Sequence, residues 1–142
     1  MEVLIPQLAW FGDTEMKLEF PEEWDVSVQV MKGHDKKSVS KKEMIHALRN
    51  PIGTKPLNRL AKDRKEVAII FDDMTRPTRD YEIVPRIIEE LQKAGINDDN
   101  IRFVCANGSH GVCDKEDFVK KLGEDIVETY PVFNHNPYAN FE

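Results

Sequence analysis

The sequence contains few cysteines, no long hydrophobic run and no excess of positive charge. Its 2 cysteines, Cys105 and Cys113, are too few for a disulfide framework and are not spaced like a common metal-binding pair, so we expect reduced thiols and no metal site. A net charge of −6 provides no basic surface, so no nucleic-acid partner is expected. Without an apolar run of about 20 residues or a signal peptide, the sequence predicts a cytoplasmic protein with no membrane partner.

Several widespread catalytic signatures are missing as well. The sequence has no glycine-rich phosphate loop, no Gly-x-Gly-x-x-Gly dinucleotide fingerprint, no His-Glu-x-x-His metal motif and no Gly-x-Ser-x-Gly nucleophile elbow. These absences exclude the generic nucleotide-binding and hydrolase classes. At 142 residues, the chain is long enough for a single domain with a substantial core.

The first part of that domain, residues 1–31, is predicted to be an antiparallel β segment. Strand-like runs at Val3–Trp10 and Glu15–Phe20 surround a Gly-Asp pair in residues 11–14, which predicts a hairpin. The stretch Asp25–Met31 alternates apolar and polar residues, which is typical of a strand with one buried face. We therefore expect three strands before the first helix.

The second part, residues 40–62, is predicted to be helical. Ser40 with Glu43 three residues later has the capping-box pattern that begins a helix. Pro56 suits the first turn of a short second helix. The basic run Lys62–Lys65 is most simply a solvated loop.

The third part, residues 66–135, alternates strands with helices. Its apolar run Val67–Phe71 lacks alternation, which is typical of a strand that is covered on both faces. The complete order is a strand at Val67–Phe71, a helix at Tyr81–Ala94, a strand at Ile101–Ala106, a helix at Asp114–Leu122 and a strand at Tyr130–Phe133. This order predicts an α/β fold with a Rossmann-like, mostly parallel sheet, flanking helices and the N-terminal antiparallel β segment.

Two polar turns follow neighbouring strands of the predicted sheet. The first turn carries two carboxylates, two hydroxyls and two guanidiniums, and the second carries an imidazole. These side chains are Asp72, Asp73, Thr75, Arg76, Thr78 and Arg79 in the first turn and His110 in the second. Because the carboxyl ends of parallel strands meet at one edge of a sheet, we expect both turns to form one cleft.

Each turn also has a simpler interpretation. The aspartates of the first turn could be ordinary turn and capping residues, but Arg76 and Arg79 near the positive end of a helix dipole favour a bound anion. His110 could be hydrogen-bonded only within its own turn. Its neighbours Gly108 and Gly111 permit close approach of a ligand, which favours a general base. His135, after the last strand, is a weaker candidate for the site.

The motifs together resemble the N-terminal domain of the lactate racemase family, whose members use a nickel-pincer nucleotide. The resemblance spans nearly the whole chain, and its most specific feature is the first polar turn followed by the Gly-Ser-His of the second. The matching segments are Ala47–Gly53, Phe71–Arg79, Ala94–Ile96, Ala106–His110, Lys121–Gly123 and His135.

The resemblance implies an isomerase that inverts C2 of a 2-hydroxy acid. One histidine removes the hydroxyl proton while a hydride moves to the cofactor, and His110 would be one of two such histidines. Arg76 would bind the substrate carboxylate or a cofactor phosphate, and Asp73 and Thr75 would line the same pocket. The supporting residues would be Asp72, Thr78 and Arg79.

Two departures from the family pattern bear on these expectations. Gly111 stands where many members have arginine, so the resemblance does not identify the hydroxy acid. The sequence also ends at Glu142, before the family's second catalytic histidine, pincer-bearing lysine and nickel ligand. We therefore expect residues 1–142 to be an N-terminal domain that needs the C-terminal domain of the same chain, and to be inactive without it. The alternatives are a non-catalytic module that binds a nucleotide or organic anion, and an interaction domain.

Overall fold

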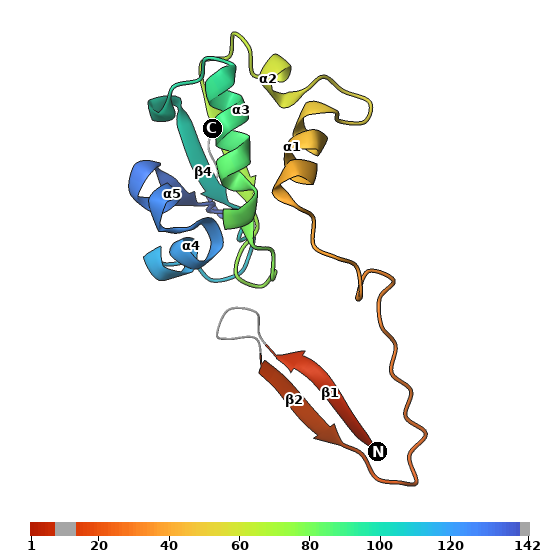
Figure 1. Ribbon diagram of the computed structural model, residues 1–142. Coiled ribbons are helices and arrows are strands. Elements are labelled where there is room, and N and C mark those ends of the chain that lie inside the picture. Colours follow the sequence, from red (N-terminus) through yellow and green to blue (C-terminus); the bar gives the residue numbers. More distant parts are fainter. Residues whose placement is uncertain (8–13, 140–142) are drawn as a thin grey trace. The chain divides into compact units, whose positions relative to one another are not determined.

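The computed structural model describes residues 1–7 and 14–139 of the chain (Figure 1). Residues 1–142, for which the sequence predicted one domain, comprise two compact units. The boundary between the units lies between Ser38 and Val39, which is the gap between the predicted β segment and the predicted helical segment.

The N-terminal unit contains an antiparallel pair of strands. β1 (Glu2–Gln7) pairs with β2 (Thr14–Glu19), with Glu2 opposite Glu19. Lys17 on β2 lies 2.5 Å from Glu2 and 3.2 Å from Glu19, so a cross-strand charge pair supports this register. The predicted pairing of two strands is confirmed, while residues 8–10 of the first predicted strand and residues 11–13 of the predicted turn lie outside the described part of the chain.

The predicted third strand at Asp25–Met31 is wrong. These residues form no strand, and Val28 and Val30 on the face predicted to be buried are exposed. Alternation permits a strand, but ladder hydrogen bonds require a neighbour. The described sheet of this unit consists of β1 and β2 alone, so this stretch has no partner strand in it.

The second unit begins with two helices that both contact a third. α1 (Lys41–Arg49) is capped by Ser40, whose hydroxyl accepts from the backbone N–H of Glu43 at 3.3 Å. The carboxylate of Glu43 in turn accepts from the backbone N–H of Ser40 at 2.7 Å, which completes the predicted capping box. α2 (Leu57–Leu60) follows Pro56 as predicted, and α1 and α2 pack against α3 (Val84–Lys93).

A three-stranded parallel sheet forms the centre of this unit, so the predicted α/β fold is confirmed (Figure 1). Its strand order is β3-β4-β5, and Val67 of β3 pairs with Ile101 of β4. The strands are β3 (Val67–Phe71), β4 (Ile101–Cys105) and β5 (Val132–Asn134). The connections contain η1 (Asp80–Glu82) and η2 (Asp98–Asn100), which are 3₁₀ turns, together with α3, α4 (Lys115–Leu122) and α5 (Glu124–Thr129).

The helices differ from the sequence prediction at two places. The helix predicted from Tyr81 begins as the 3₁₀ turn η1, and the α-helix begins only at Val84, with Pro85 in its first turn where no N–H is needed. Gly123 ends α4 as predicted, at a φ of 90° that favours glycine. However, α5 follows at once. The sequence analysis did not predict this helix, because its six residues are too few to show a helical period.

The sheet buries one face, although β3 was predicted to be covered on both. Phe71 on the inner face stacks edge-on against Phe103 and Phe118, with ring centroids 6.5 and 5.9 Å away. On the opposite face of β3, Ile70 is 71% exposed. The prediction fails because the apolar side chains that α3, α4 and α5 bury all belong to the core on the inner face, which contains Phe71 and Phe103.

Among residues 1–7 and 14–139, no helix combines the length and the apolar character that crossing a bilayer requires.

Candidate active site

The segment after β3 forms a tight turn around a buried carboxylate. Asp73 is buried, and its Oδ1 accepts from the backbone N–H of Thr75 at 3.0 Å and from the Thr75 hydroxyl at 2.5 Å. The backbone N–H of Arg76 donates to the Asp73 carbonyl at 3.2 Å. Aspartate commonly satisfies the backbone two residues later in this way, so the local sequence favours this turn.

The segment after β4 brings an imidazole to the same carboxylate. The N–H of Ala106 donates to the carbonyl of Phe71 at 2.8 Å and so extends the pairing of the two strands. Gly108 has a φ of 54°, and the turn closes when the N–H of His110 donates to the carbonyl of Asn107 at 2.9 Å. Nδ1 of His110 then lies 2.5 Å from Oδ2 of Asp73.

Asp73 and His110 form a dyad with one buried and one exposed member. The His110 side chain is 56% exposed, so its ring reaches solvent beyond the contact with Asp73. Burial tends to raise the pKa of Asp73, but hydrogen bonds from Thr75 and His110 outweigh it and lower that pKa overall. An ionised Asp73 holds the hydrogen of His110 on Nδ1, which leaves the Nε2 lone pair available to take a proton.

The two arginines of the first turn are exposed. The backbone of Arg76 belongs to the turn that surrounds Asp73, as its N–H donates to the Asp73 carbonyl. No other described residue pairs with the Arg76 guanidinium. The Arg76 guanidinium, close to Asp73 in the sequence, is therefore available to donate two parallel hydrogen bonds to a carboxylate or a phosphate.

Asp72 and Thr78, two of the supporting residues, are hydrogen-bonded to each other. The Thr78 hydroxyl donates to Oδ2 of Asp72 at 2.7 Å. Asp72 also accepts from Nζ of Lys121, a residue to which the sequence analysis assigned no role. Lys121 lies on α4 between the buried Phe118 and Leu122, and its place on that apolar face is the signal that could have identified it.

The pKa of a second acidic residue, Asp80, is shifted in the same cluster. Oδ2 of Asp80 is buried without a hydrogen-bond partner and lies 3.7 Å from Nζ of Lys121. Burial raises the pKa of Asp80 to about 6, against the attraction of Lys121, and the neighbouring Asp72 adds to the rise.

Comparison with known proteins identifies the family. The family described as lactate racemase N-terminal domain matches residues 11–140 of the chain. The chain belongs to this family. Two curated proteins named lactate racemase are similar to it: one from Thermoanaerobacterium thermosaccharolyticum, 30% identical over 128 residues, and one from Lactiplantibacillus plantarum, 36% identical over 89 residues. These alignments cover 89% and 63% of this chain.

A solved structure extends the likeness to the fold. The structure of the lactate racemase apoprotein from Thermoanaerobacterium thermosaccharolyticum matches 96% of this chain with a TM-score of 0.68 and 28% sequence identity. The chain spans about 30% of that structure, and 30% and 21% of the two curated relatives. This lactate racemase family domain therefore corresponds to the smaller part of those proteins.

The two cysteines of this lactate racemase family domain lie on either side of the His110 turn. Both are free and buried, and their Sγ atoms are 3.9 Å apart. Burial, followed by the proximity of Cys113, raises the pKa of Cys105 to about 12. A thiol with so high a pKa is a poor nucleophile at neutral pH, so Cys105 acts as a core residue.

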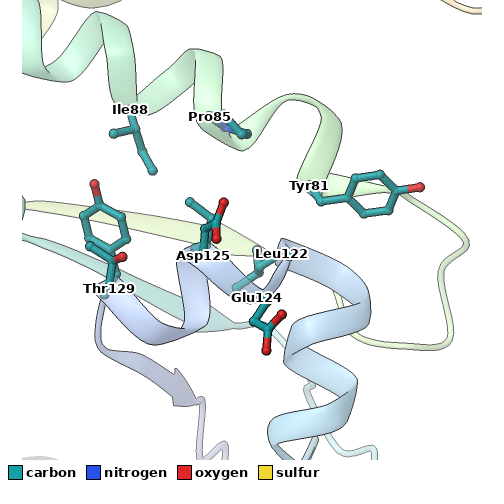
Figure 2. A pocket seen from close by; sticks show the side chains of 10 residues that line it. Tyr81, Pro85, Ile88, Leu122, Glu124, Asp125 and Thr129 are labelled. Atoms are coloured by element: carbon teal, nitrogen blue, oxygen red, sulfur yellow. The ribbon is translucent and has the colours of Figure 1, made fainter.

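One cavity of the second unit lies apart from the dyad. It has a volume of about 430 Å³ and lies between α3 and the α4–α5 pair (Figure 2). Its lining includes Tyr81, Ile88 and Tyr130 but none of the predicted site residues. Of these two places, only the dyad contains an imidazole.

The described hydrogen bond of His135 does not involve Asp73 or His110. Its backbone N–H donates to the carbonyl of Cys105 at 3.0 Å, which places the residue at the end of β4. Its side chain is exposed, and the contact to Asp73 is made by His110.

Proposed function

We propose that this chain is the N-terminal part of an isomerase that inverts C2 of a 2-hydroxy acid, with His110 as one of its acid/base groups. The observation that carries the proposal is the contact between the buried Asp73 carboxylate and Nδ1 of an imidazole that is largely open to solvent. Membership of the lactate racemase N-terminal domain family supports the same class of reaction.

The dyad matches what inversion at C2 demands. The C2 hydrogen leaves as hydride while the hydroxyl proton is removed, and the resulting 2-keto acid is planar at C2. Nε2 of His110 takes the proton, and Asp73 stabilises the imidazolium that forms. In the return step, the same nitrogen gives a proton back to the oxygen. Arg76 would orient the molecule by holding its carboxylate.

The nickel-pincer nucleotide expected for this family supplies the hydride acceptor and donor when it is bound. In the described part of the chain, no group of three His, Cys, Asp or Glu side chains is arranged to hold a metal ion. The feature that fits the cofactor is the Arg76 guanidinium, which suits one phosphate group. We expect the remaining contacts, including the second histidine, in a C-terminal domain, and we expect residues 1–142 alone to hold the cofactor weakly.

A second candidate function is anion binding without chemistry. The Arg76 guanidinium, which pairs with no other described residue, favours it, because that cation would hold a nucleotide phosphate or an organic acid whether or not a reaction follows. The two functions differ in what His110 contributes, since only the isomerase needs its proton transfer.

The decisive experiment measures racemisation of L-lactate and other 2-hydroxy acids by the cofactor-loaded enzyme that contains this chain. We expect His110→Gln to lower kcat by about 10²- to 10⁴-fold, the usual contribution of a positioned acid or base. His34→Gln, an exposed histidine of the N-terminal unit, is the matched control and should leave kcat unchanged. An unaltered kcat in His110→Gln would refute the isomerase role, and retained anion binding in that variant would then favour the module.

A further inference from the structure

Lys121 is a buried lysine at the end of α4. It is 1% exposed, whereas lysines are almost never fully buried unless they are paired. Removing an ammonium from water is costly, so the surrounding groups must offset that cost. The partners of Lys121 therefore indicate what it is for.

Three hydrogen bonds of Lys121 go to the polar segment after β3. Nζ donates to Oδ1 of Asp72, to the carbonyl of Arg76 at 2.9 Å and to the carbonyl of Thr78 at 3.1 Å. The carboxylate of Asp80 lies 3.7 Å away. One ammonium thus joins four positions of a segment that is more than 40 residues earlier in the sequence.

That segment has no helix or strand of its own to determine its shape. Between the end of β3 and η1, the backbone belongs to no helix or strand, so beyond the local turn at Asp73 its carbonyl groups need donors from other elements. Arg76 is tied at both of its backbone groups: its N–H donates to the Asp73 carbonyl and its carbonyl accepts from Lys121. The position from which the Arg76 side chain extends is consequently determined relative to the dyad.

We propose that Lys121 is the positioning residue of this site, which holds the backbone of Arg76 and Thr78 so that the Arg76 side chain extends beside the Asp73–His110 dyad. The proposal rests on the proposed function in one respect, namely that Arg76 binds the anionic group of the ligand. A purely stabilising role would not require a lysine, because a well-packed apolar residue often stabilises a core as much as a buried ion pair does.

The first test measures amide hydrogen exchange in the 142-residue chain. Lys121→Met keeps a straight side chain of high helix propensity and removes the three donors. We expect the amides of residues 74–79, apart from Pro77, which has no N–H, to exchange at least tenfold faster in this variant, while amides 101–105 of β4 keep their rates. Lys115→Met, an exposed lysine at the start of the same helix, is the matched control. Unchanged rates at 74–79, or the same acceleration at 101–105, would overturn the proposal.

A second variant decides the case if Lys121→Met fails to fold. Asp72→Asn leaves Lys121 in place and weakens one of its contacts at a half-buried residue, so the core is preserved. We expect faster exchange confined to the same segment, by a smaller factor. Exchange rates at 74–79 equal to those of the wild type would then count against the proposal.

The third test links Lys121 to the ligand through Arg76. L-lactate and inorganic phosphate are titrated as probes by NMR into the wild type, Lys121→Met, Arg76→Ala and the double variant. We expect each single change to weaken binding about tenfold and the double variant to bind no more weakly than Arg76→Ala, because Lys121 acts through Arg76. Additive losses of affinity in the double variant would refute the claim that Lys121 acts through Arg76. If the wild type binds neither probe, the role of Arg76 in the proposed function fails, while hydrogen exchange still decides whether Lys121 holds the segment.

Discussion

Replacement of Asp80 by asparagine should make this protein more stable at neutral pH. In the folded protein, burial and the nearby Asp72 raise the pKa of Asp80 to about 6 from its ordinary value of 3.8. The folded state therefore binds a proton more tightly than the unfolded state does, and ionisation of Asp80 costs stability as the pH rises. One pKa unit corresponds to 1.36 kcal/mol, so the full cost above pH 7 is on the order of 3 kcal/mol.

The cost depends on pH in a defined direction. It is nearly absent below pH 3.8, grows between pH 3.8 and about 6, and is complete above that range. An asparagine at position 80 cannot ionise, and its amide can donate to Asp72. Asp80→Asn should thus raise the free energy of unfolding by about 2–3 kcal/mol at pH 7.5, by about 1.5 kcal/mol at pH 5 and by about 0.5 kcal/mol at pH 4.

Urea unfolding of wild type and Asp80→Asn at these three pH values measures the effect, and an unchanged m-value shows that the substitution alters stability and not the surface exposed on unfolding. Asp99→Asn, an exposed aspartate of η2, is the matched control and should change little at any of them. A stability difference between wild type and Asp80→Asn that is constant across the pH range, or a loss of stability at pH 7.5, would show that Asp80 does not carry a buried charge.

Three further predictions concern other parts of the fold. Ser40→Ala removes the N-cap of α1 and should cost about 1 kcal/mol in thermal or chemical unfolding, with helix content retained. Glu90→Gln should cost about 1–3 kcal/mol in urea, because Glu90 is buried on α3 and binds Arg49 of α1 at 2.8 Å. Cys105 should react with iodoacetamide at pH 7.5 far more slowly in the native protein than in urea, and equal rates would contradict its burial.

Local signals in the sequence predicted most of the secondary structure of the second unit. The runs that became β3 and β4 are apolar, and Ser40 and Asp114 begin α1 and α4 through capping boxes whose two members are only three positions apart. Such signals are readable because both interacting groups lie within one helical turn of each other. The error at Asp25–Met31 arose because a strand needs a partner, and in the described part of the chain this stretch has no neighbouring strand.

The amino-acid sequence by itself determined the chemistry of the site, since it placed acids, hydroxyls, guanidiniums and an imidazole in two turns after apolar strands. Only the tertiary structure decided which of them act together. Asp73 meets His110 across 37 residues, and Lys121 meets the Arg76 carbonyl across 45. Contacts at that separation depend on strand register and on how α4 packs against the end of the sheet, and no pattern within a single segment encodes them.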